Sequence, residues 1–243
     1  MNRQFAGTLG MQFPVDWMLV AVLSATAGTV DVIGFLALGG LFTAHITGNL
    51  VVLVAHYVTG GFSQMGPLLS VPVFVAVLGI ITALYSDKVT RGTRRGLLIL
   101  HAILLAGFLV FGVRYGPFIN PDGAIAVCAG MLGVSAMATQ NALVKLELRG
   151  FPSTAVVTTN TVQLTIDLAS LIRGKGDPRD LAQANRRARL TIPSVGGFVA
   201  GCATGGFLEI HFGLRSLVLP VLLAVVAVLL DETWLVSPKG ARS

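Results

Sequence analysis

Apolar segments of membrane-spanning length repeat along almost the whole chain of 243 residues. Each segment is close to the roughly 20 residues that an α-helix needs to cross the hydrocarbon core of a bilayer. The segments cover residues 17–40, 42–59, 69–86, 96–113, 122–144, 153–172, 190–210 and 214–236. The longest polar stretch, residues 173–189, is too short to form a soluble domain. The sequence therefore predicts an all-α integral membrane protein.

The composition agrees with this class. Only 12% of the residues are charged, against roughly 25% in an ordinary soluble domain, and the mean hydropathy is +0.81. The 29 glycines suit closely packed transmembrane helices. Cys128 and Cys202 lie in apolar segments with no second cysteine or histidine at metal-ligand spacing. We expect both to be small core residues and not part of a disulfide or metal site.

The distribution of basic residues argues against eight crossings. The connection at 87–95 and the stretch at 173–189 are both rich in Lys and Arg, and the positive-inside rule places both in the cytoplasm. Three apolar segments lie between them, so they would face opposite sides if every segment crossed. Both fit if segments 42–59 and 153–172 are re-entrant. This gives six transmembrane helices plus two re-entrant segments, with both termini cytoplasmic. Eight spans, with one basic connection outside, are the alternative.

An internal repeat favours the same arrangement. The string "TAHITGN", residues 43–49, recurs as "TAVVTTN", residues 154–160, so both read Thr-x-x-x-Thr-x-Asn. Upstream, Asp31 aligns with Asn141 if one gap is allowed, and downstream "FVA" at 74–76 matches "FVA" at 198–200. We expect two membrane repeats within one membrane domain, residues 1–116 and residues 117–243. Three crossings in each repeat would make the halves inverted, as in many transporters.

Polar side chains inside these apolar segments are candidates for a binding site. Asp31 lies deep in the first segment, where a carboxylate costs about 2.5–3.5 kcal/mol and usually faces a bundle interior or a wet cavity. His45 could form a proton or cation relay with it. Hydroxyls, amides and a glycine from both halves would complete the site near the membrane midplane: Thr47, Gly48, Asn49, Gln140, Asn141, Thr158 and Asn160.

The same residues also have a purely structural interpretation. Gly48 permits the bend of a broken helix, and Thr and Asn side chains can satisfy backbone groups where helical bonding stops. Asp31 could likewise only bond a neighbouring helix or cap a broken segment. We expect structural roles for His56 and His101.

No pattern in the chain supports an enzyme. There is no Walker-type phosphate loop, GxSxG, HExxH or GxGxxG motif, so we predict no catalytic residues, no metal site and no cofactor. The leading hypothesis is a transporter or channel for a small solute or ion, coupled to protons or cations through Asp31. The alternative is a non-transporting accessory or assembly protein. The expected partners are the lipid bilayer and the solute or ion, and a homo-oligomer is an open alternative. Membrane topology explains the net charge of +6, so we expect no nucleic-acid partner.

Two long strings resemble a known family. "AGTVDVIGFLALGGLFTAHITGN", residues 27–49, and "ATQNALVKLELRGFPSTAVVTTN", residues 138–160, are similar to the YoaK-like family of uncharacterised multi-pass bacterial membrane proteins. The family pattern falls on Gly28, Asp31, Gly34, Phe35, Leu36, Thr47, Gly48 and Asn49, and then on Gln140, Asn141 and Ala142. Thr159 departs from it, because a glycine is expected after the threonine. The resemblance implies a protein embedded in the bacterial plasma (inner) membrane and little about activity.

Overall fold

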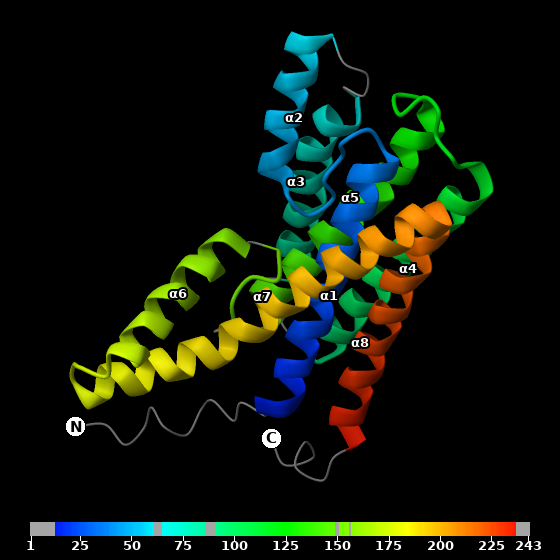
Figure 1. Cartoon of the computed structure of the whole chain (residues 1–243). Helices are drawn as coiled ribbons and strands as arrows, with labels where there is room; N and C mark the ends of the chain where they lie inside the picture. The colour runs from blue at the N-terminus through cyan, green and yellow to red at the C-terminus, as the bar shows by residue number, and fades with distance from the viewer. Residues whose placement is uncertain (1–12, 61–64, 86–90, 149–150, 156, 237–243) are drawn as a thin grey trace.

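The computed structural model describes residues 13–60, 65–85, 91–148, 151–155 and 157–236 (Figure 1). This described part is helical apart from its connections and contains no strand. The elements are α1 (Phe13–Ala37), α2 (Ile46–Thr59), α3 (Met65–Tyr85), α4 (Arg91–Tyr115), α5 (Ala124–Glu147), α6 (Val157–Arg173), α7 (Pro178–Phe212), the 3-10 helix η2 (Gly213–Leu217) and α8 (Val218–Val236).

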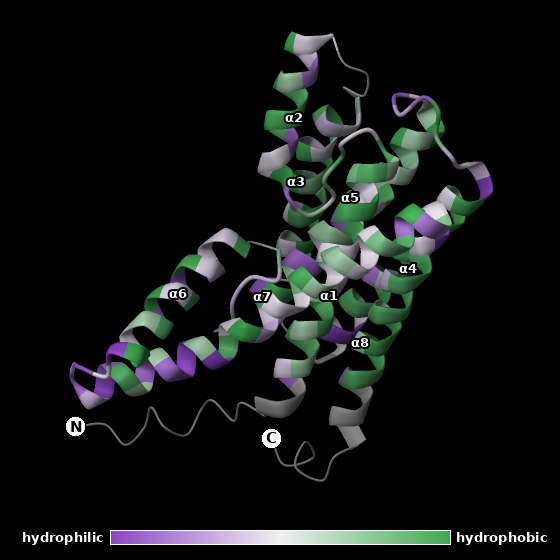
Figure 2. Cartoon of the chain, in the orientation of Figure 1, coloured by the Kyte–Doolittle hydropathy of each residue, from purple (hydrophilic) through white to green (hydrophobic). Residues whose placement is uncertain are grey.

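Several of these helices are long and apolar enough to cross a membrane. Within the described residues there are five such helical stretches: Asp16–Ala37, Met65–Tyr85, Gly92–Tyr115, Ala124–Glu147 and the continuous stretch Pro178–Asp231, which runs through α7, η2 and most of α8. With 14 and 17 residues, α2 and α6 are shorter. Hydrophobic residues dominate α3, α4 and α8, whereas hydrophilic ones gather where α6 meets α7 (Figure 2). The all-α membrane class is confirmed.

The start of α7 differs from the predicted segment 190–210. The helix begins at Pro178 and takes in most of the polar stretch. Asp177 caps it, since its side chain accepts a hydrogen bond from the amide of Arg179 at 2.8 Å, and proline is favoured at the first helical position. Local capping chemistry therefore sets this boundary, and apolar length alone does not reveal it.

Helix packing crosses the predicted boundary between the halves. α1 packs along α7, and α5 packs along α3. α4 also contacts α5, α8 contacts α1, and the short helices α2 and α6 pack on α3 and α7. Each half therefore supplies a helix to the core of the other.

The α1–α7 contact depends on small residues. A Cβ atom added at Gly201 would lie 2.2 Å from the carbonyl oxygen of Ala25, and one added at Gly28 would lie 2.3 Å from that of Phe198. The hydroxyl of Thr29 donates to the carbonyl of Gly201 at 3.1 Å across the same contact. Small residues let helix backbones approach closely in membranes, where packing drives association.

Two sets of contacts define the ends of the bundle. At the first end, which we call the Arg94 end, Arg94 contacts Asp16 of α1 at 3.1 Å and Asp231 of α8 at 2.8 Å. At the second, the Asp122 end, the carboxylate of Asp122 accepts a hydrogen bond from the amide of Met65 at 2.9 Å. The starts of α1 and α4 and the end of α8 thus meet at one end, whereas α3 and α5 begin at the other (Figure 1).

Candidate functional site

Asp31 holds the connection between α1 and α2 against the middle of α1. One carboxylate oxygen, Oδ1, accepts hydrogen bonds from the amides of Thr43 and Ala44, at 2.8 and 2.6 Å, and from the Thr43 hydroxyl at 3.1 Å. The other, Oδ2, pairs with Nδ1 of His45. Gly40 takes a positive φ of 91°, a conformation that glycine adopts without strain, where the chain turns back from the end of α1. The connection therefore returns to the level of Asp31 before α2 begins.

Asn49 fastens the first turn of α2 in the same way. Its side chain exchanges two hydrogen bonds with the backbone of Phe42, at 2.8 and 2.7 Å, and donates a third to the hydroxyl of Ser70 in α3 at 2.7 Å. The residue is fully buried. Two of these bonds hold the non-helical connection in place and the third ties α2 to α3, which is the structural role considered for this residue.

Comparable hydrogen bonds occur around the second polar string. Asn160 donates to the carbonyl of Ser153 at 2.6 Å and to the hydroxyl of Ser194 in α7 at 3.0 Å. Gln140 donates hydrogen bonds to the hydroxyl of Thr154 and to the carbonyl of Leu23, both at 2.9 Å. In the first half, Asp31 instead accepts a hydrogen bond from the hydroxyl of Thr43.

Asn141 has a different position from the one that the sequence alignment with Asp31 suggests. Its amide donates to the carbonyl of Met137 in its own helix, at 2.9 Å. Gln140, and not Asn141, contacts the first threonine of the second string, as Asp31 contacts the first threonine of the first string. Gln140 precedes Thr154 by 14 positions, whereas Asp31 precedes Thr43 by 12, so an alignment with a single gap does not pair them.

Four of the predicted site residues line one pocket, which we call the His45 pocket. Its volume is about 390 Å³, and α1, the connection, α2 and α7 all contribute to it. Its lining consists of Asp31, Val32, Phe35, Phe42, His45, Thr47, Gly48, Phe198 and Cys202. The His45 ring is 33% exposed and lies edge-on to Phe198, with 5.4 Å between ring centroids. Because Nδ1 faces Asp31, Nε2 is the ring nitrogen left to exchange a proton or bind a solute.

The other predicted residues do not line this pocket. Asn49 is fully buried beside it, and Thr158 is exposed on α6. Gln140 and Asn160 belong to the second set of contacts, around Ser194 and Thr154. The structure thus does not bring the predicted residues into one common cluster. Those of the first half lie in or beside the His45 pocket, Gln140 and Asn160 lie outside it, and Asn141 and Thr158 join neither set.

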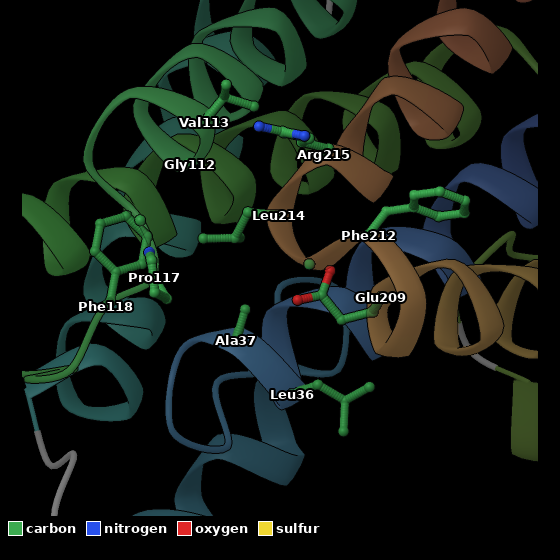
Figure 3. A pocket seen from close by; sticks show the side chains of 12 residues that line it. Leu36, Ala37, Gly112, Val113, Pro117, Phe118, Glu209, Phe212, Leu214 and Arg215 are labelled. Atoms are coloured by element: carbon green, nitrogen blue, oxygen red, sulfur yellow. The ribbon is translucent and has the colours of Figure 1, made fainter.

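A second pocket, which we call the Glu209 pocket, has a volume of about 510 Å³ and is lined by α1, the end of α4, the connection that follows it, α7 and η2. Figure 3 shows the side chains that line it. Because the end of α4 and the following connection contribute to it, the pocket lies nearer the Asp122 end. The carboxylate of Glu209 lies on its wall and accepts a hydrogen bond from the hydroxyl of Ser216. On α7, Glu209 of this pocket lies two helical turns after Cys202 of the His45 pocket. On α1, Leu36 of this pocket lies about one turn after Val32 of the His45 pocket. Both pockets therefore lie along one face of the α1–α7 pair.

Ser70 and Ser194 were missed as partners of the two asparagines, although the sequence carries a signal for them. The match between "FVA" at 74–76 and 198–200 extends upstream to "SVPVFVA" and "SVGGFVA", residues 70–76 and 194–200. The two serines open this longer match. Aligning the segments over seven residues would have identified them.

The remaining candidates have identifiable environments. His101 is fully buried, with Nδ1 3.0 Å from the carbonyl of Ala136, as expected for a structural residue. Asp167 is 1% exposed and pairs with Arg187 of α7 at 2.7 Å. Cys128 was expected in the core, which is wrong, because it is exposed on α5. Among the described residues, no group of three or more His, Cys, Asp or Glu could hold a metal ion.

Comparison with known proteins places the chain in a family. Residues 19–230 match the family described as "Protein of unknown function (DUF1275)". The chain belongs to this family. It is 30% identical over 161 residues to the UPF0700 transmembrane protein YoaK of Bacillus subtilis (strain 168), and the match covers 63% of this chain and 64% of that protein, just under two thirds of its length. No solved structure matches. The resemblance carried by the two long strings is confirmed, and the name of this relative describes a transmembrane protein.

Proposed function

We propose that this protein is a transporter or channel for a small solute or ion, and that the His45 pocket is its binding site. One observation carries the proposal: a buried carboxylate orients a histidine on the wall of a pocket inside an apolar bundle. Ionisable groups inside membranes are rare and mark ion or proton pathways. The hydrogen bond to Asp31 fixes the ring, so His45 is the coupling residue and Asp31 positions it.

We further propose six transmembrane helices and two re-entrant segments, each formed by a connection and the short helix that follows it. The return of residues 38–45 to Asp31 supports this for the first half. The basic residues support it as well. Trp17 donates a hydrogen bond to the carbonyl of Arg189 at 3.0 Å, which brings the basic part of α7 to the Arg94 end. Both basic regions then face the cytoplasm, with the two termini.

Two inverted repeats follow from the same arrangement. α1 begins at the Arg94 end and its counterpart α5 begins at the Asp122 end. The packing of α1 on α7 matches that of α5 on α3, and the Asn49–Ser70 contact matches the Asn160–Ser194 contact. Such repeats are common in secondary transporters, whose sites lie near the midplane beside broken helices.

The Glu209 pocket is the proposed outer entrance to the path. It lies on the same face of α1 and α7 as the His45 pocket, and closer to the Asp122 end. A carboxylate there would concentrate protons or cations before they reach His45. A proton or a small cation is accordingly the proposed permeant or coupling species.

Proton flux into proteoliposomes tests the function. A pH-sensitive dye inside the vesicles would report acidification under an imposed gradient, alone and with pools of inorganic ions, amino acids or sugars outside. We expect flux with the wild type, a loss of at least tenfold in His45→Gln, and retention in His211→Gln, whose ring is exposed. Wild-type vesicles that match empty vesicles under every condition, or a His45→Gln variant with full flux, would contradict the proposal.

Cysteine labelling tests the topology. In a Cys128→Ala, Cys202→Ala background, single cysteines at Ile119 and Lys175 would be labelled with a membrane-impermeant reagent from each side. Only α5 crosses between them in the six-span arrangement, so position 119 should react from outside and position 175 from inside. Eight spans predict labelling of both from the same side.

A non-transporting accessory or assembly role is the second candidate. It is favoured by the bonding of Asn49, Gln140 and Asn160, all buried and all tied to backbone or hydroxyl groups. Their polar strings would then serve the fold alone. In that case His45→Gln should leave abundance and the recovery of partner proteins unchanged, with no flux to lose.

A further inference from the structure

A groove at the Arg94 end combines cationic and apolar walls. It lies between α1 and α7 and has a volume of about 640 Å³. Trp17, Ala182, Asn185, Arg186, Arg189, Leu190 and Ile192 line it. Arg186 and Arg189 are three positions apart on α7, a spacing that places side chains on the same face of a helix. The groove therefore presents two guanidinium-bearing side chains beside an indole ring.

Arg187, which lies between the two groove arginines in the sequence, contacts α6. It binds the carboxylate of Asp167 through Nη2 at 2.7 Å and through Nε at 3.2 Å. This ion pair joins α6 to α7. Arg186 and Arg189 line the groove.

The groove lies where the surface changes from polar to apolar. α7 is rich in charged residues up to Arg189, and apolar residues dominate from Leu190 onward (Figure 2). Trp17 is 41% exposed and Ile192 is 47% exposed. Tryptophan is enriched at the level of lipid headgroups, with its ring between the polar and apolar layers. The hydrogen bond from Trp17 to the Arg189 carbonyl, at 3.0 Å, holds the ring at this position.

We propose that this groove binds the headgroup of an anionic phospholipid, with its phosphate on Arg186 and Arg189 and an acyl chain along Trp17 and Ile192. Guanidinium groups bind phosphate through paired, charge-assisted hydrogen bonds. Basic pockets between transmembrane helices on the cytoplasmic side are suited to such headgroups. A free phosphate would use only the arginines, whereas a lipid also uses the apolar wall. The inference is independent of the transport function.

Lipid binding to the detergent-purified full-length protein tests the proposal. Native mass spectrometry would compare dioleoyl phosphatidylglycerol with dioleoyl phosphatidylcholine at matched concentrations. We expect tighter binding of the anionic lipid to the wild type. An arginine near a membrane surface contributes about a fivefold factor, so Arg186→Gln with Arg189→Gln should weaken binding by about thirtyfold.

The control removes the same charge from the same end outside the groove. Arg173, the last residue of α6, and Lys175, in the turn before α7, are both exposed. The double variant Arg173→Gln with Lys175→Gln should bind the anionic lipid within about twofold of the wild type. Equal losses in both double variants would show non-specific charge attraction and overturn the site. The site would also be overturned if the groove variant bound the anionic lipid as tightly as the wild type does. The same holds if inorganic phosphate displaced the lipid at an equal concentration.

Chemical footprinting of the wild type makes the test independent of variant folding. Phenylglyoxal modifies arginines, and its extent at each site is measurable by mass spectrometry. Phosphatidylglycerol should protect Arg186 and Arg189 and leave Arg114 and Arg173 unchanged, whereas phosphatidylcholine should protect none of them. Uniform protection, or none at the groove, would refute the proposal.

Discussion

Replacing Asp31 by alanine should lower the free energy of unfolding by about 2–6 kcal/mol. Asp31 is 3% exposed, and its carboxylate accepts hydrogen bonds from the amides of Thr43 and Ala44. Alanine would leave both amides buried without that acceptor, and each such group costs about 1–3 kcal/mol. The connection 38–45 would then detach from α1 and widen the His45 pocket.

Two milder variants separate the acceptor role from other effects. Asp31→Asn keeps an oxygen for the two amides but loses the charge and replaces Oδ2, the partner of His45, by an NH2 group, so it should cost about 1–2 kcal/mol. Thr43→Val removes a single hydroxyl bond of 3.1 Å and keeps the methyl group that packs near Gly34 and Gly133. Polar bonds between membrane helices average about 0.6 kcal/mol, which is the loss expected here.

Reversible unfolding in mixed micelles, followed by circular dichroism, would measure these free energies. The expected order of destabilisation is Asp31→Ala, then Asp31→Asn, then Thr43→Val. If the alanine and valine variants fall within 1 kcal/mol of each other, Asp31 does not hold the connection. If asparagine is as damaging as alanine, the charge and the contact with His45 determine the stability, and the hydrogen bonds from the two amides do not. Should the alanine variant fail to accumulate, the ratio of the two milder losses still tests the reasoning.

Three further variants have defined outcomes. Gly201→Ala should lower the melting temperature, at a cost of about 1–3 kcal/mol for overpacking, because its Cβ would lie 2.2 Å from the Ala25 carbonyl oxygen. The control Gly196→Ala should leave the melting temperature unchanged, since nothing lies within 4 Å of the added atom; equal effects would disprove the close α1–α7 contact. Arg187→Gln should speed tryptic cleavage of the α6–α7 turn, since it leaves the buried carboxylate of Asp167 without its cation. Adding Asp167→Asn to the same chain should slow the cleavage again, and unchanged cleavage in Arg187→Gln would show that the ion pair does not hold α6. Asn49→Leu should destabilise by about 1 kcal/mol more than Asn141→Leu in chemical unfolding, because Asn49 loses three hydrogen bonds and Asn141 loses one, at about 0.6 kcal/mol each. Equal losses would contradict the fastening role of Asn49.

The class of the fold could be predicted from the sequence because bilayer thickness sets segment length. Most apolar segments became helices within a few residues of the predicted bounds, such as Met65–Tyr85 for 69–86. The start of α7 could not be placed this way. It depends on the Asp177 cap and the proline after it, and the first turns of the helix are polar.

The candidate site could be predicted only within each half. The contact of Asp31 with His45 joins residues 14 positions apart, and the polar strings pointed to it. Phe198 and Cys202 complete the same pocket from α7, far along the chain. Their place depends on the register of α7 against α1, which the glycines fix, and no polar motif signals it. The two polar strings were expected to meet. Instead, the first contacts α1 and α3, and the second contacts α5 and α7.

The cross-packing of α1 on α7 has a consequence for biosynthesis. Thr29 and its partner Gly201 are 172 residues apart, and at a synthesis rate of about 5–20 residues per second α7 emerges roughly 10–30 seconds after α1. During that interval α1 must reside in lipid or in the insertion machinery without its main neighbour. The loop that clamps Asp31 is made within a second or two of the helix itself, since its donors follow by 12 and 13 residues. The carboxylate of Asp31 therefore gains its hydrogen-bond donors early in synthesis. The nascent first half can then reside in the membrane without an unpaired carboxylate exposed to lipid.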